Sequence, residues 1–135
     1  MLSYQMMKSN KGFSLVEVLI VAAIISLLAS IAIPNIIRAR IESNEAAAQA
    51  TLKTISTALE NYYTTNNQYP ASTAVLTSSV PPYLNENFFG STYNGFNFSA
   101  PTLTIATYEI LAEPSSSAMG TRSFTISTGG VLNVN

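Results

Sequence analysis

The chain has 135 residues and a formal net charge of −1, and its six basic residues form no run that could neutralise the phosphates of a nucleic acid. Apolar residues make up 47% of the chain and charged residues only 10%, and the apolar residues are concentrated near the N-terminus, which is unusual for a cytosolic domain. The sequence contains no Cys, His, Trp or Asp, so it cannot form disulfides and lacks the residues that most often act as general base and metal ligand.

The first predicted element is an apolar helix from Phe13 to Ile33. This run has 21 residues and a single charged side chain, Glu17. As a helix it would be about 31 Å long, which matches the hydrocarbon thickness of a bilayer. Basic residues flank it in equal number and do not fix its orientation: Lys8 and Lys11 before it, Arg38 and Arg40 after it. We predict a membrane-spanning segment.

Pro34 is expected to kink or loosen the helix without ending it, because its ring crowds the carbonyl four residues back and it has no N–H to donate. From Asn35 to about Asn66 an amphipathic helix is predicted, because apolar residues recur three or four apart. This stripe comprises Ala48, Leu52, Ile55, Leu59 and Tyr62. The polar face is predicted to hold Lys53, Ser56, Thr57 and Glu60. The helix should end near Thr65, where Asn66 and Asn67 favour left-handed geometry.

The C-terminal half is predicted to be an ordered loop followed by a small sheet. Residues 71–91 show no sustained period and indicate a loop with at most one short turn. Apolar alternation then predicts three strands, around residues 96–98, 103–110 and 124–126, with residues 131–134 as a fourth. Short connections at residues 115–120 and 129–130 favour an antiparallel meander packed on the helix.

The most specific local pattern is Lys11-Gly12-Phe13-Ser14-Leu15-Val16-Glu17, in which a basic residue and a glycine precede the apolar run and its one carboxylate. This pattern resembles the cleavage and methylation motif of type IV pilins and type II secretion pseudopilins. The resemblance is specific across residues 8–34, including Pro34, is looser to Tyr69-Pro70, and is only architectural from there to Asn135.

The resemblance implies a precursor with three parts: a leader (1–12), a transmembrane and filament-core helix (13–34), and a globular domain (35–135) that includes the amphipathic half of the helix. The implied fold is α+β and pilin-like, with the long N-terminal helix packed against a small C-terminal antiparallel sheet. A prepilin peptidase would cut after Gly12 and methylate the new amine of Phe13. Glycine suits the cut because a backbone without a side chain can enter a narrow active site.

Glu17 is the residue whose position needs explaining, because an ionised carboxylate at the bilayer centre costs about 2.5–3.5 kcal/mol. The resemblance implies that Glu17 pairs with the N-terminal amine of a neighbouring subunit during assembly. Two alternatives stay open at this point. The carboxylate can reach the membrane interface, or it can fold back onto the amine of its own chain.

The resemblance also implies that Pro34 marks the point where the helix loosens in filaments. Small residues in the span permit close helix approach: Ala22, Ala23, Ser26, Ala29, Ser30 and Ala32. We expect no metal at the carboxylate pairs Glu42/Glu45 and Glu109/Glu113, no hydrolytic dyad at Lys53 and Ser56, and no cofactor.

The predicted function is therefore that of a structural subunit, not an enzyme: a prepilin of a type IV pilus-like filament. Its implied partners are copies of itself, the bacterial inner membrane before assembly, the peptidase, an assembly platform protein and an ATPase, with no nucleic acid evident. The mature chain would lie in a cell-surface pilus or a periplasmic pseudopilus. A type II secretion pseudopilin is the alternative, and a soluble exported binding module with an ordinary signal peptide is a more distant one.

Overall fold

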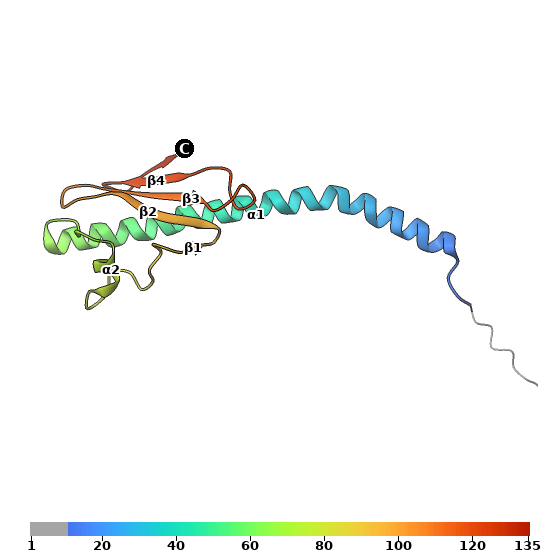
Figure 1. Cartoon of the computed structure of the whole chain (residues 1–135), viewed down its shortest axis with the longest axis horizontal. Helices are drawn as coiled ribbons and strands as arrows, with labels where there is room; N and C mark the ends of the chain where they lie inside the picture. The colour runs from blue at the N-terminus through green and yellow to red at the C-terminus, as the bar shows by residue number, and fades with distance from the viewer. Residues whose placement is uncertain (1–10) are drawn as a thin grey trace, which may run out of the picture. The chain divides into compact units, whose positions relative to one another are not determined.

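The computed structural model describes residues 11–135, so the predicted leader up to Asn10, with Lys8, lies outside the described residues. The chain divides into two compact units, Met1–Ile36 and Ile37–Asn135. The elements, in chain order, are α1 (Leu15–Asn66), α2 (Ala74–Ser78), β1 (Thr92–Tyr93), β2 (Phe96–Leu103), β3 (Tyr108–Pro114), β4 (Phe124–Ser127) and β5 (Val131–Val134). The predicted α+β class is confirmed (Figure 1).

Helix α1 has 52 residues and contains Pro34, so the prediction that the proline does not end the helix is confirmed. The helix ends at Asn66, and the next residue, Asn67, has a φ of +53°. The N–H of Asn67 donates to the carbonyl of Tyr63 over 2.7 Å and closes the last turn. Asparagine adopts left-handed geometry more readily than most residues, which explains why the helix stops here.

In the unit Ile37–Asn135, the five strands form one sheet in the order β1-β2-β3-β4-β5, with every neighbouring pair antiparallel. Figure 1 shows this meander running alongside the green part of α1. Between Ser99 and Thr102 the register of β2 against β3 shifts. Pro101 lies at this irregularity, as expected for a residue that cannot donate to the ladder. The predicted meander is confirmed, and β1 is a short strand that the periodicity did not reveal.

The predicted strand over residues 103–110 is wrong at its start, because residues 104–107 form the turn between β2 and β3. The N–H of Thr104 donates to the carbonyl of Thr107 over 2.9 Å, and the Thr104 hydroxyl accepts from the Thr107 N–H over 3.0 Å. Such local side-chain bonds compete with a strand ladder. The alternation of Leu103 and Ile105 with Thr104 and Ala106 therefore does not mark a strand.

The core of this unit lies between the second part of α1 and the sheet. Of the predicted stripe, Ala48, Leu52, Ile55 and Leu59 are buried, and Tyr62 is partly buried against them. The sheet contributes alternate residues, of which Phe96, Ile110 and Phe124 are fully buried. Burial of a large apolar side chain stabilises a fold by about 1.5–3 kcal/mol, so this layer is the main source of stability. The short helix α2 adds Leu76, also fully buried, and fits the short turn predicted for residues 71–91.

Candidate processing and assembly site

The predicted cleavage site, Gly12–Phe13, lies in a short segment before α1. Residues 11–14 precede the first helical residue, Leu15, and the Phe13 side chain is 90% exposed. A Cβ placed on Gly12 would meet no atom within 4 Å. Packing among the described residues therefore does not require a glycine at this position, and cleavage after Gly12 stays a prediction.

Ser14 and Glu17 form reciprocal hydrogen bonds at the start of α1. The backbone N–H of Ser14 donates to Oε2 of Glu17 over 2.7 Å, and the N–H of Glu17 donates to Oγ of Ser14 over 3.2 Å. This arrangement is a capping box, which satisfies N–H groups that have no partner within the helix. The sequence signal was present, a serine followed three residues later by a glutamate, but sequence reasoning assigned Glu17 only to an amine or to the interface.

The box shows a third use for the Glu17 carboxylate beside the two alternatives considered from the sequence. Within the precursor, one of its oxygens already accepts a backbone hydrogen bond from its own chain. A partly satisfied carboxylate costs less to place in an apolar segment than an isolated one. The structure holds single chains, so the predicted pairing of Glu17 with a neighbouring amine remains a prediction.

Helix α1 is the one helix among the described residues that is long and apolar enough to cross a membrane, with a mean hydropathy of 2.7 in its most apolar window. None of that window is buried. The large apolar side chains from Phe13 to Ile37 are all about half exposed or more. A bare apolar surface of this length needs lipid or protein around it.

Two serines interrupt this apolar surface, and both bind their own helix. Oγ of Ser26 donates to the carbonyl of Ala22 over 2.8 Å, and Oγ of Ser30 donates to the carbonyl of Leu27 over 2.6 Å. Their hydroxyls need no external partner in an apolar environment. Close approach of other helices at these serines stays a prediction.

In the unit Ile37–Asn135, Glu45 is a buried carboxylate whose role the sequence did not reveal. Its Oε1 accepts from the N–H and hydroxyl of Thr121 and from the N–H of Arg122, over 2.9, 3.0 and 3.2 Å. Its Oε2 accepts two bonds from the Arg122 guanidinium, the Nε bond being 2.8 Å long. Burial would raise the pKa of Glu45, but these hydrogen bonds outweigh it and lower the pKa. Glu45 thus ties α1 to the loop between β3 and β4.

Glu60 is a second carboxylate with a structural role, although the sequence placed it on the polar face. Its Oε1 accepts from the hydroxyls of Tyr69 and Tyr108 over 3.1 and 3.0 Å, and from the N–H of Gly129 over 3.1 Å. Burial, together with the bond to Glu60, raises the pKa of Tyr69 to about 12. The placement of Ser56 on the polar face is wrong, because Ser56 is buried with its hydroxyl 2.8 Å from that of Tyr108.

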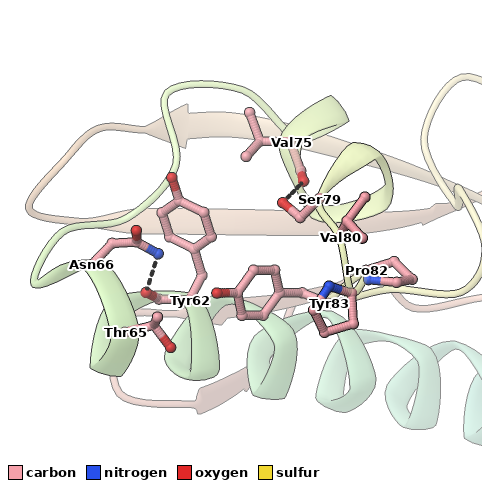
Figure 2. Close-up of a pocket in the computed structure, with 9 residues that line it drawn as sticks. Tyr62, Thr65, Asn66, Val75, Ser79, Val80, Pro82 and Tyr83 are labelled. Carbon is pink, nitrogen blue, oxygen red and sulfur yellow. Dashed lines mark hydrogen bonds between the residues drawn. The ribbon is translucent and has the colours of Figure 1, made fainter.

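A cavity of about 510 Å³ lies between the end of α1 and the segment around α2 (Figure 2). The rings of Tyr62 and Tyr83 meet edge to face there, with centroids 5.2 Å apart. The hydroxyl of Ser79 and the amide of Asn66 both donate to backbone carbonyls beside it. Tyrosines are the only titratable residues among its nine lining residues.

The carboxylate pairs considered from the sequence, Glu42/Glu45 and Glu109/Glu113, have different surroundings in the part of the chain that the structure describes. No group of three potential ligands lies together among residues 11–135. Glu45 forms an ion pair with Arg122, while Glu42, Glu109 and Glu113 are exposed. A divalent cation usually takes six or more oxygen ligands, which isolated surface carboxylates do not supply.

Comparison with known families gives two adjacent matches. A family described as "Prokaryotic N-terminal methylation motif" matches residues 7–33. A second, described as "Type IV minor pilin ComP, DNA uptake sequence receptor", matches residues 34–125. The junction of the two matches falls at Pro34, the residue singled out from the sequence.

Individual relatives agree with these families. The type IV major pilin protein PilA of Myxococcus xanthus is 42% identical over 60 residues, covering 44% of this chain and 27% of that protein. The type IV wide pilus major component PilA4 of Thermus thermophilus is 42% identical over 72 residues, covering 53% of this chain and 55% of that protein. The type II secretion system core protein G of Aeromonas hydrophila is 31% identical over 65 residues, covering 48% of this chain and 46% of that protein. The chain thus spans from about a quarter to about half of the length of these relatives.

Proposed function

Since this chain belongs to the type IV minor pilin ComP family, whose match covers residues 34–125, we propose that it is the precursor of a structural subunit of a type IV pilus-like filament. The observation that carries the proposal is the exposed apolar surface from Phe13 to Ile37, preceded by a cleavage motif that matches the methylation family. This surface faces lipid in the precursor and sister helices in the filament. The relatives named above are structural pilus and secretion components, which favours a subunit over an enzyme.

The proposed precursor has three parts: the leader 1–12, the membrane and filament-core helix 13–34, and the globular domain 35–135. A prepilin peptidase of the inner membrane cuts between Gly12 and Phe13 and methylates the new amine. The exposure of Phe13 and the open space around Gly12 support this site. An assembly platform protein and an ATPase then move the subunit from lipid into the filament, in the cell-surface pilus or in a periplasmic pseudopilus.

Glu17 and Pro34 have proposed assembly roles. After cleavage the carboxylate of Glu17 pairs with the Phe13 amine of a neighbouring subunit, and an unpaired carboxylate penalises wrong registers. Pro34 removes one hydrogen bond from α1, so the helix is easiest to unwind there under load.

A type II secretion pseudopilin is the second candidate, because the core protein G of Aeromonas hydrophila is 31% identical to this chain over 65 residues. The major pilin relatives have the higher identity, 42% against 31%, and favour the pilus. The DNA uptake named in the family description finds no support in the charges of residues 37–135, where Arg122 is already bound to Glu45. An ordinary signal peptide fits less well, because its apolar core is usually shorter and uncharged.

Determining the N-terminus of the mature chain tests the proposal. We expect peptide mass spectrometry of membrane and filament fractions to find Phe13 first, with one additional methyl group. A mature chain that begins at Ile33, as an ordinary signal peptide would leave it, would overturn the proposal. Electron microscopy of surface filaments, labelled through a peptide tag on this chain, then separates the pilus from the secretion pseudopilus.

A further inference from the structure

The capping box assigns a role to Ser14 that neither the family matches nor the proposed function contains. Ser14 is the N-cap of α1 by two independent contacts. Its hydroxyl accepts from the N–H of Glu17, and its carbonyl accepts the first helical hydrogen bond, from the N–H of Val18 over 3.3 Å. A residue with both contacts is the half-helical boundary of a helix. The helix therefore begins two peptide bonds after the predicted cut.

We propose that Ser14 is a positioning residue for leader cleavage: by capping α1 it keeps the Gly12–Phe13 peptide bond out of the helix and open to the peptidase. This inference rests on the proposed function, because it concerns the cleavage of this chain as a prepilin. It means that cleavage requires a non-helical backbone at the Gly12–Phe13 bond in addition to a glycine at position 12.

The chemistry of the cut explains why the cap matters. In peptide hydrolysis, water attacks the carbonyl carbon of Gly12 and the bond to the nitrogen of Phe13 breaks. Gly12 is left with a carboxylate and Phe13 with an amine. If α1 began one turn earlier, the Gly12 carbonyl would accept a hydrogen bond from the N–H of Val16 and would be enclosed by the helix. An enzyme would have to unwind that turn before water could reach the carbonyl.

The sequence offers an alternative start for the helix. Asn10 is outside the described residues, and asparagine is as good an N-cap type as serine. A helix capped at Asn10 would place residues 11–14 in its first turn. Glycine is a poor helix former, so Gly12 should lower the population of the extended helix about fivefold relative to an alanine at this position. Ser14 and Gly12 thus act together to hold the cut outside the helix.

The test uses the full-length precursor in detergent micelles with purified prepilin peptidase. We expect Ser14→Ala to slow cleavage by about three- to fivefold at low substrate concentration, the factor that one capping bond contributes. Ser14→Thr keeps a capping hydroxyl and should cleave within about twofold of wild type. Ser26→Ala is the matched control, since Ser26 lies in the same helix and binds only the Ala22 carbonyl. It should cleave at the wild-type rate.

A rescue separates positioning from direct recognition of the serine by the peptidase. Proline at the first helical position disfavours helix in the residue before it and needs no N–H partner there. The double variant Ser14→Ala/Leu15→Pro should therefore recover most of the lost rate. In the single variant, hydrogen exchange at the Val16 amide should slow, because that amide has joined a helical bond.

Three outcomes would overturn the inference while the proposed function stands: a Ser14→Ala precursor cleaved as fast as wild type, slow cleavage that the proline does not restore, or unchanged exchange at Val16. If the wild-type precursor itself is not cut at Gly12, the proposed function fails instead. The two failures are therefore distinguishable in one set of reactions.

Discussion

The carboxylates of Glu45, which is buried, and Glu60, which is partly buried, are the groups that the sequence explained least. Glu60 was predicted on the polar face of the helix, where a glutamate usually lies, and Glu45 was considered only in a carboxylate pair that was expected to bind no metal. Their partners come from far along the chain: Arg122 for Glu45, and Tyr108 and Gly129 for Glu60. Helical periodicity indicates only on which face of α1 a residue lies. Contacts with residues so far along the chain could therefore not be predicted from it.

Replacing Glu45 tests this interpretation at the scale of one residue. Glu45→Ala should lower the free energy of unfolding of the globular unit by about 2–4 kcal/mol, because the N–H groups of Thr121 and Arg122 lose a buried acceptor. Glu42→Ala, an exposed carboxylate three residues earlier, should change it by less than about 0.5 kcal/mol. Chemical denaturation of the full chain in micelles, followed by tyrosine fluorescence, measures both. Equal effects of the two substitutions would contradict the assignment.

The same carboxylate predicts an acid dependence. The pKa of Glu45 is lowered from its ordinary value of 4.5 in the folded state, so the folded chain holds the proton less tightly than the unfolded chain. The stability that the ionised Glu45 contributes to the fold is fully present above the ordinary pKa of 4.5 and is lost as the pH falls through the lowered pKa of the folded state. Glu45→Ala should therefore flatten the loss of stability below about pH 4.5. An unchanged slope in the variant would show that other groups are responsible.

At the scale of elements, the sequence predicted what local chemistry decides. The helix end at Asn67, the buried stripe of α1 and the hairpin turn at Gly129-Gly130 all follow from backbone preferences and periodicity. The strand predicted from Leu103 failed because the hydroxyl of Thr104 closes a turn within its own segment. Alternation cannot show whether a threonine hydroxyl will bind the backbone.

Gly120 gives a prediction for the connection between β3 and β4. A Cβ at this position would lie 2.6 Å from the Phe96 ring and 3.0 Å from the Pro114 side chain. Gly120→Ala should therefore destabilise the globular unit by about 1–3 kcal/mol through overpacking. Phe96→Leu replaces the obstructing ring by a smaller side chain. The double variant should therefore lose less unfolding free energy than the two single variants lose together. Additive losses in thermal unfolding would rule out this contact as the cause.

At the scale of the whole molecule, composition and the N-terminal motif were enough to predict the α+β class and the family. The apolar run, its single carboxylate and the helix that continues past Pro34 are properties of one contiguous segment, which is why they can be read directly. The capping box also has a signal in the sequence, Ser14 followed three residues later by Glu17, but the predictions assigned Glu17 only to an amine or to the membrane interface. The proposed pairing with a neighbour concerns several chains and needs an assembly experiment.

Filament formation tests Glu17 at this scale. Glu17→Ala should abolish or reduce surface filaments at least tenfold while the precursor accumulates normally in the membrane, because an unpaired Phe13 amine is left in an apolar core at a cost of several kcal/mol. Ser30→Ala, another polar residue of the span, should leave filament yield unchanged, since its hydroxyl binds only the Leu27 carbonyl. Quantitative immunoblots of sheared filaments against whole cells measure the ratio. A normal ratio in Glu17→Ala would show that this pairing does not guide assembly.

The two serines of the span have a consequence for the reverse process. In the proposed filament, Ser26 and Ser30 would keep the hydrogen bonds that they donate to carbonyls of their own helix, so a return of the helix to the bilayer would break no polar contact at either hydroxyl. The proposed exchange between lipid and sister helices would therefore carry no polar cost in either direction along this stretch of α1.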